Sequence, residues 1–242
     1  MNYPKSGNYD KSFVDAGMMG PNVLKLTEEL SGHLRLEKGM KVLDLGCGRA
    51  MSSIFLAREF DVTVCATDLW IPAAENWERI KAMGVEDRVI PIHAEAHQLP
   101  YADNFFDAVV SFDAYHYFGT NELYLSDYLA KLVKPGGQIA IASPGFTHEL
   151  SEEELEELRP YWMCGKFLTF HSHKWWKNLW ERTGVVDVIE AFDMGCSAPA
   201  WEDWINSSNR MGQSDRGFYE NVKQLATVAI IATRNNGDSF AL

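Results

Sequence analysis

The 242-residue chain has few cysteines, no long apolar run and no excess of basic residues. Its four cysteines are widely spaced and form no CxxC pair, which argues against a zinc knuckle and a disulfide framework and predicts no metal site. No stretch reaches the length of a membrane span, and the polar start MNYPKSGNYDKSF lacks the apolar region of a signal peptide. We therefore expect a soluble, cytoplasmic and unprocessed protein without stable membrane insertion.

The shortage of basic residues bears on the kind of partner. Acidic residues (34) outnumber basic residues (22), which gives a net charge of -12 at neutral pH. A protein of that charge repels phosphate backbones and anionic membrane faces, so we expect no nucleic-acid substrate. The pattern predicts no particular oligomeric state.

Short apolar runs alternate with amphipathic stretches, which is typical of parallel βαβ units. The expected strands are 41–45, 62–67, 88–93, 106–112, 138–143, 185–192 and 225–233. The expected helices are 21–35, 52–59, 73–83, 121–133, 152–158 and 173–182. A turn is expected at Pro135-Gly136-Gly137. This order predicts a single doubly wound α/β domain over residues 1–242, with a mostly parallel, seven-stranded, Rossmann-like sheet.

Two connections, residues 146–172 and 194–224, are too long to be simple loops. They are rich in aromatic residues, and six of the eight tryptophans of the chain follow residue 160. We interpret both connections as inserted cap segments that lie over the strand ends and line a substrate pocket. An aromatic pocket suits an amine cation through cation–π contact, and it suits an aromatic ring or a quinone precursor equally well.

The most informative motif is Val42-Leu43-Asp44-Leu45-Gly46-Cys47-Gly48, in which a carboxylate near the end of a buried strand precedes two glycines. Glycine lets a ligand approach the backbone closely, and the N-terminus of the next helix adds a positive field. A dinucleotide fingerprint needs a third glycine, but Met51 stands there. Asp44 fits poorly beside a pyrophosphate and well beside a cationic methionine ammonium. A nucleoside sulfonium is therefore favoured over a nicotinamide dinucleotide.

A second acid, Asp68, ends the second expected strand. At this place an acidic side chain can accept hydrogen bonds from both hydroxyls of a ribose. The alternative is an N-cap for the next helix. Leu69, Trp70 and Pro72 separate Asp68 from that helix, which favours the ribose role.

Taken in order, the motifs DLGCG, ATDLW, AEAHQLPYADNFFDAVVS and LVKPGG resemble the motif series of class I S-adenosylmethionine-dependent methyltransferases, over about residues 38–145. Within that class, the sequence resembles the UbiE-like and amine-methylating enzymes that act on small molecules. The resemblance implies S-adenosyl-L-methionine as the cofactor and a nitrogen, oxygen or carbon atom of a small molecule as the methyl acceptor. The cofactor-binding positions that it implies are Asp44, Gly46, Cys47, Gly48, Asp68, Leu69, Glu95, Ala96 and Asp113.

Three of these positions have specific expected roles. Glu95 and Ala96 stand where the class holds the adenine amino group and ring nitrogen, and Glu95 replaces the usual aspartate with a longer acid. Asp113 is expected to face the cofactor. His116, close behind it, is expected to face the transfer site, where a histidine can remove a proton from, or orient, an oxygen or nitrogen nucleophile. A helix-capping or core role is the alternative for His116.

The N-terminal segment, residues 1–20, resembles the lid that closes over the cofactor in these families. Its stretches Gly7-Asn8-Tyr9-Asp10 and Gly17-Met18-Met19-Gly20 have the glycine flanks that suit a gate which excludes water. Tyr9 is the second catalytic candidate. An ordered tail is the alternative.

Two other functions stay open at this point. One is an NAD(P)-dependent oxidoreductase on the same fold, and the other is an S-adenosylmethionine-binding protein without turnover, because a fold alone never establishes an activity.

Overall fold

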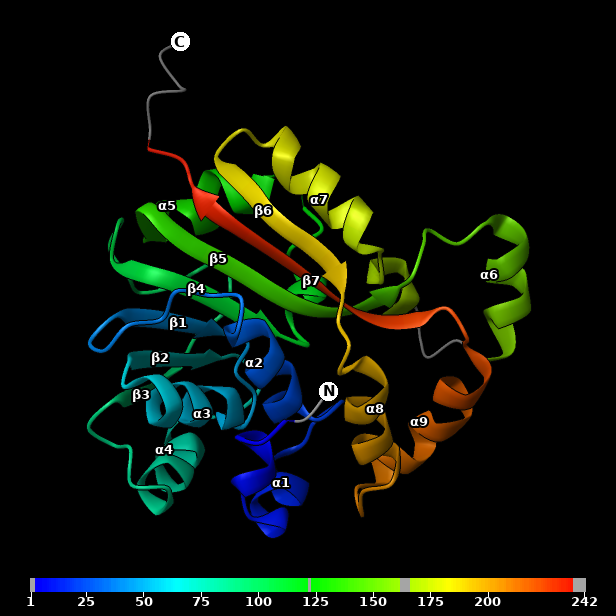
Figure 1. The fold of residues 1–242 in the computed structure, drawn as a ribbon, viewed down its shortest axis with the longest axis horizontal. Coiled ribbons are helices and arrows are strands. Elements are labelled where there is room, and N and C mark those ends of the chain that lie inside the picture. The colour runs from blue at the N-terminus through cyan, green and yellow to red at the C-terminus, as the bar shows by residue number, and fades with distance from the viewer. Residues whose placement is uncertain (1–2, 122, 162–165, 237–242) are drawn as a thin grey trace.

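The computed structural model of the chain describes residues 3–121, 123–161 and 166–236. Its central layer is a seven-stranded sheet that is covered by helices on both faces (Figure 1). The strands are β1 (Lys41–Leu45), β2 (Thr63–Asp68), β3 (Val89–His93), β4 (Phe106–Phe112), β5 (Val133–Phe146), β6 (Val186–Asp193) and β7 (Leu225–Arg234).

The strand order is β3-β2-β1-β4-β5-β7-β6. Strands β1 to β5 pair in parallel, whereas β7 is antiparallel to both β5 and β6. The prediction of a doubly wound, mostly parallel sheet of seven strands is therefore confirmed.

Side chains of β1 alternate between the two faces: Val42 packs into one core cluster and Leu43 into the other. The helices on the Val42 face are α2 (Val23–Ser31), α3 (Met51–Phe60) and α4 (Ala73–Ala82). The Leu43 face is covered by a π-helical segment η3 (Tyr124–Leu129), its continuation α5 (Ala130–Leu132) and α7 (His173–Arg182). Among the described residues, none of the helices combines the length and apolarity needed to cross a membrane.

The segments expected to be caps hold further helices. These are α6 (Glu152–Leu158), η4 (Arg159–Tyr161), η5 (Lys166–Thr169), α8 (Ser197–Ile205) and α9 (Arg210–Asn221). Figure 1 shows α6, α8 and α9 beyond one end of the long strands β5 and β7. Trp201 and Phe218 there share an apolar cluster with Met18, which follows η1 (Ser6–Asn8) and α1 (Lys11–Gly17). Residues 162–165 of the expected cap 146–172 lie outside the described residues.

Most expected boundaries lie within a residue or two of the observed ones, the helix expected over 21–35 spans Val23–Ser31, and two further expectations differ in kind. The turn at Pro135-Gly136-Gly137 lies inside β5, where Gly136 has φ +74° and the pairing with β4 shifts register between Phe106 and Ala108. The turn residues thus form an irregularity within β5, because pairing with β4 continues on both sides of them. The helix expected over 121–133 is instead a π-helical segment followed by one short turn, and it ends at Leu132.

The contact between β5 and the segment before α7 yields a stability prediction. A Cβ on Gly145 would lie 2.2 Å from the backbone carbonyl oxygen of His171. We expect Gly145→Ala to lower the free energy of unfolding by about 1–3 kcal/mol, because backbone must move to accept the methyl group. Urea denaturation measures this change.

The matched control is Gly217→Ala in α9, where a Cβ would meet nothing within 4 Å. Alanine favours a helix over glycine by up to about 1 kcal/mol, so this variant should be as stable as the parent or more stable. A Gly145→Ala protein with unchanged stability would contradict the packing described.

Candidate active site

The loop between β1 and α3 is tied to the end of β2 by its own backbone. The N–H groups of Gly46 and Cys47 donate to the carbonyl oxygen of Thr67, at 2.8 and 3.1 Å. Gly46 and Gly48 have φ values of +75° and +51°, which side-chain-bearing residues rarely adopt. A Cβ on Gly46 would also lie 2.4 Å from the Cβ of Ala114. The backbone path therefore requires glycine here.

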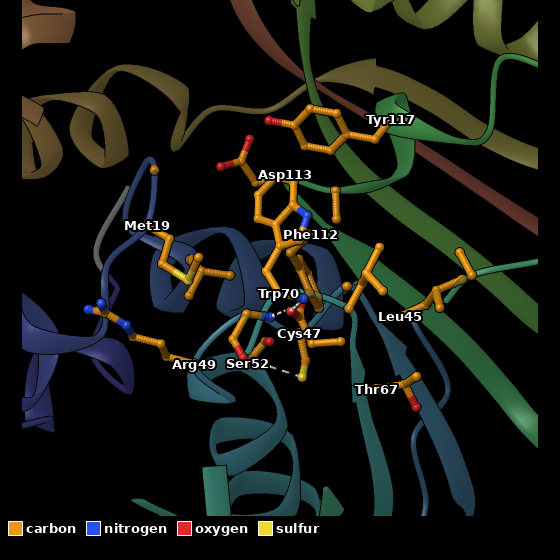
Figure 2. A pocket seen from close by; sticks show the side chains of 18 of the residues that line it. Met19, Leu45, Cys47, Arg49, Ser52, Thr67, Trp70, Phe112, Asp113 and Tyr117 are labelled. Atoms are coloured by element: carbon orange, nitrogen blue, oxygen red, sulfur yellow. Dashed lines mark hydrogen bonds between the residues drawn. The ribbon is translucent and has the colours of Figure 1, made fainter. Parts of the chain in front are cut away.

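Above this loop lies a cavity with an empty volume of about 1030 Å³ (Figure 2). It opens over the carboxyl ends of β1, β2 and β4, and its walls come from residues within 17–23, 45–52, 67–70, 94–96 and 112–118. Eight of the nine residues expected to bind cofactor line it: Gly46, Cys47, Gly48, Asp68, Leu69, Glu95, Ala96 and Asp113. The ninth, Asp44, does not line it.

Asp68 is held in place by three backbone donors. Its Oδ2 accepts from the N–H of Gly48 at 2.8 Å, and its Oδ1 accepts from the N–H groups of Trp70 and Ile71 at 2.7 and 2.9 Å. The N-cap residue of α4 is Pro72, so Asp68 does not cap that helix. A carboxylate fixed in this way keeps further acceptor capacity for hydroxyl groups in the cavity.

Asp44 is fully buried directly beneath the loop. Its Oδ2 accepts hydrogen bonds from the hydroxyls of Ser52 and Ser53, both at 2.6 Å. Its Oδ1 is buried and has no hydrogen-bond partner among the described residues. Burial raises the pKa of Asp44 to about 6, against the opposing effect of the two serines. Ser52 lines the cavity, so the hydroxyl of this residue lies between the carboxylate of Asp44 and the cavity.

Glu95 is the acid expected near an adenine amino group. Its Oε1 pairs with Nδ1 of His97 at 2.7 Å, and its Oε2 accepts from the backbone N–H of His97 at 2.8 Å. Burial raises the pKa of Glu95, but the hydrogen bonds from His97 outweigh burial and hold that pKa below its usual value. The neighbouring Ala96 is fixed through its carbonyl oxygen, which accepts from the hydroxyl of Tyr124 at 2.9 Å.

A second cavity, with an empty volume of about 570 Å³, adjoins the first. The walls shared by both cavities are Met19, Gly20, Pro21, Asp113 and Tyr117. Asp113 has φ +54°, and a Cβ on Gly20 would lie 2.1 Å from its Oδ2. The carboxylate therefore stands at the junction, where only glycine at position 20 leaves room for it.

The two catalytic candidates lie in different places. His116 lines the second cavity, 2% exposed, with its ring 4.0 Å from that of Tyr117 and 5.4 Å from that of Phe170 between centroids. Tyr9 lines neither cavity. Its ring packs 6.0 Å from Phe13 and 5.7 Å from Phe55, so this conformation gives no geometric support to a catalytic role for Tyr9.

Several residues that line the cavities were not among the expected site residues, and Ser52, Trp70 and Tyr117 are examples. Ser52 donates a hydrogen bond to Asp44 and lines the cavity. The sequence signal that could have pointed to it is a hydroxyl side chain in the first helical turn after the glycine loop. Trp70, 62% exposed, and Tyr117 meet edge to face at 5.3 Å across the mouth of the first cavity (Figure 2). The contact between Trp70 and Tyr117 depends on tertiary structure, so no local sequence pattern predicts it. Within the described ranges, no group of three or more acidic, histidine or cysteine side chains could hold a metal ion.

The sheet order and the cavity first define a general class of protein. Strand order reverses between β1 and β4, and a cofactor in such a sheet binds outside the carboxyl ends of the strands at that switch point. The glycine loop and Asp68 both lie there. The chain thus has the doubly wound architecture that binds a nucleoside cofactor.

Sequence comparison then finds similarity to methyltransferases. A family model described as a methyltransferase domain matches residues 42–137. The chain is 34% identical over 119 residues to methyltransferase GfsG of Streptomyces halstedii. The aligned residues are 49% of this chain and 42% of that protein. It is 32% identical over 118 residues to the 27-O-demethylrifamycin SV methyltransferase of Amycolatopsis mediterranei, with coverages of 48% and 43%. The matched part spans less than half the length of both relatives.

Solved structures share the fold at low sequence identity. Geranyl diphosphate C-methyltransferase from Streptomyces coelicolor has a TM-score of 0.68 and 18% identity, over 88% of this chain and 79% of that one. The [4+2]-cyclase SpnF has a TM-score of 0.72 and 14% identity, over 90% and 84%. These solved structures share the fold of this chain, and the similarity to methyltransferases in sequence lies in the match to residues 42–137.

The bonding of Asp68 gives a first prediction for this site. Asp68→Ala should weaken the binding of S-adenosylhomocysteine roughly 10- to 100-fold, because hydrogen bonds to a charged group contribute about 1.5–3 kcal/mol. Isothermal titration calorimetry measures it. Asp87→Ala, at an exposed pair with Arg88, is the control and should bind as the parent does. Equal affinity of the Asp68 variant and the parent would disprove the ribose assignment.

The raised pKa of Asp44 gives a pH prediction. Above pH 6 the buried carboxylate is charged and attracts a ligand ammonium, whereas below pH 6 it takes up a proton and that attraction is lost. The affinity for S-adenosylhomocysteine should therefore fall as the pH is lowered through about 6.

Titrations of the parent and of Asp44→Asn across this range test the assignment. The variant should bind weakly at every pH and lack the step near pH 6. A step of equal size in both proteins would assign it to another group.

Proposed function

We propose that this chain transfers the methyl group of S-adenosyl-L-methionine to a nitrogen, oxygen or carbon atom of a small molecule. The observation that carries the proposal is the junction of the two cavities at Gly20, Asp113 and Tyr117. A transfer reaction needs two compartments that hold donor and acceptor in fixed relation, since alignment supplies much of the rate. The second cavity provides the acceptor compartment.

The first cavity fits a cofactor that carries positive charge. The buried, unpartnered Oδ1 of Asp44 lies beneath it, and Asp68, Glu95 and Asp113 line it. Arg49 is the one described lysine or arginine in its lining, and its guanidinium is engaged by the carbonyl oxygen of Ala16. Such surroundings stabilise a methionine ammonium and a sulfonium.

The same surroundings disfavour a nicotinamide cofactor. A dinucleotide would place its pyrophosphate at the glycine loop, among these carboxylates. Met51, 1% exposed, fills the position of the third glycine, and its Sδ lies 2.0 Å from an ideal Cβ on Gly17. The side chain of Met51 therefore occupies the position where the dinucleotide motif has a glycine without a side chain.

When bound, S-adenosyl-L-methionine supplies an activated methyl group on a sulfonium that becomes a neutral thioether. The chain itself orients both partners and excludes water. In this proposal His116, which lies in the wall of the second cavity, holds or accepts a proton from an acceptor O–H or N–H group. In this proposal residues 1–20 act as a lid, through Gly17, Met19 and Gly20, and residues 146–172 and 194–224 act as the substrate cap.

Relatives with diverse acceptors support a small-molecule substrate. Phosphoethanolamine N-methyltransferase 1 of Triticum aestivum is 28% identical over 185 residues, which are 75% of this chain and 35% of that protein. Together with the rifamycin and geranyl diphosphate enzymes above, the names of these relatives cover transfer to nitrogen, oxygen and carbon.

Incubation with methyl-labelled S-adenosylmethionine and a fractionated small-molecule extract tests the proposal. We expect S-adenosylhomocysteine to form and the label to appear in one or a few small molecules. Tight binding of S-adenosylhomocysteine with no labelled product from any fraction would instead favour a binding protein without turnover.

The position of His116 predicts an effect on turnover. His116→Ala should lower kcat by about 10²- to 10⁴-fold, the usual contribution of a positioned acid or base, while the affinity for S-adenosylhomocysteine changes little. Steady-state kinetics with the labelled acceptor and calorimetry measure the two effects. His148→Ala, whose histidine pairs with Glu154 outside both cavities, is the control. An unchanged kcat would assign His116 to packing.

A further inference from the structure

The second cavity has a distinctive composition. Its aromatic walls come from four separate parts of the chain and comprise Tyr117, Phe170, Trp201, Trp204 and Phe218. Its titratable groups besides Tyr117 are the carboxylates Asp113 and Asp215 and the imidazole of His116, and no lysine or arginine occurs among the described residues of its lining. Two carboxylates and five aromatic rings thus line the same space.

The two carboxylates come from separate elements of the fold. Asp113 follows β4, and Figure 2 shows its carboxylate near the hydroxyl of Tyr117. Asp215 belongs to α9, and its Oδ2 accepts a hydrogen bond from the indole N–H of Trp204 at 2.9 Å. Burial raises the pKa of Tyr117 to about 12, and the charges of Asp113 and Asp215 both add to the rise. Both charges therefore act on the space next to this phenol.

An aromatic wall and a carboxylate favour the same kind of guest. The face of an indole or phenyl ring attracts a cation within about 6 Å of its centre, most strongly when water is excluded. A carboxylate or phosphate on the guest would meet the two carboxylates, and the described lining offers it no lysine or arginine to offset its desolvation. A neutral guest would gain from the rings alone.

We infer that the second cavity binds a small organic cation, an amine that is protonated in water, and that this amine carries no carboxylate or phosphate group. The identification of the cavity as the acceptor compartment rests on the proposed function. The inference narrows that function to amine substrates. It separates this chain from its relatives named for phosphoethanolamine and glycine, whose acceptors carry an anionic group.

Matched probes test this inference by binding, without turnover. The protein is first titrated with S-adenosylhomocysteine and saturated with it, and calorimetry then compares two sets of compounds. The first set is choline, its neutral isostere 3,3-dimethylbutan-1-ol and its carboxylate analogue betaine. The second set is phenethylamine, 2-phenylethanol and phenylalanine. In at least one set the cation should bind about 10-fold or more tightly than both of its analogues.

The charge of Asp215 is tested separately because this residue lines only the second cavity. Asp215→Asn removes the charge and keeps an oxygen that can accept the indole N–H of Trp204. It should weaken binding of the preferred cation about 10-fold, leave the neutral isostere unaffected and leave S-adenosylhomocysteine binding unchanged. Glu220→Gln, an exposed acid of the same helix paired with Arg216, should change none of these affinities.

The outcomes distinguish this inference from the proposed function. If S-adenosylhomocysteine binds but neither cation is preferred over its analogues, the amine assignment is wrong and the methyltransferase proposal stands. Equal loss of affinity for cation and neutral isostere in Asp215→Asn would also overturn the assignment, because it would show a loss of shape rather than of charge. If S-adenosylhomocysteine does not bind the parent protein in the first titration, the proposed methyltransferase function itself is wrong.

Discussion

The structure depends on one set of backbone ties between the loop after β1 and the end of β2. Gly46 and Cys47 donate to the carbonyl oxygen of Thr67, and Gly48 donates to the carboxylate of Asp68. These bonds fix the height of the cavity floor and the direction in which α3 leaves it. They also orient Asp68 before any ligand arrives, so part of the ordering entropy of binding is lost during folding. The side chain of Asn76 adds a further tie to the carbonyl oxygen of Gly48 at 2.9 Å.

The order of the strands explains why two cavities meet above this floor. The chain leaves β1 for helices on one face and leaves β4 for helices on the other, so the loops after the two strands diverge. Gly46 and Ala114 approach each other at the base of the divergence, and Asp113 stands directly above it. In a chain with a net charge of -12, carboxylates from separate segments converge at this place. One negative potential can therefore stabilise both a sulfonium and an amine.

Much of this architecture follows from the sequence alone. The strands 41–45 and 106–112 and the helices 152–158 and 173–182 are predicted to the residue, because apolar or amphipathic runs there end abruptly at polar residues, glycine or proline. The extension of β5 through Pro135-Gly136-Gly137 is not predicted, because it depends on pairing with β4 at Val133 and again from Gln138 onward, on both sides of the local turn. Local chemistry decided the first case and tertiary pairing decided the second.

The candidate site divides in the same way. The glycine loop and Asp68 are recognisable because their spacing along the chain is short, and the structure places them in one cavity. The pairing of Asp44 with Ser52 and Ser53 requires a known helix direction. Asp113 after β4 and Asp215 in α9 line the same cavity although they are far apart in the sequence, and no sequence pattern encodes this placement. Residues 194–224 are predicted as a cap, yet α8 and α9 within them could not be placed.

The central claim is that the cavity over the glycine loop holds S-adenosyl-L-methionine. It is tested most directly by thermal unfolding of the protein with S-adenosylhomocysteine, NADH or NADPH. A ligand that binds only the folded state adds about 2.7 kcal/mol of stability at 100 times its Kd, so S-adenosylhomocysteine should raise Tm and the two nicotinamides should leave it unchanged. A rise in Tm with NADH or NADPH, and none with S-adenosylhomocysteine, would contradict the account.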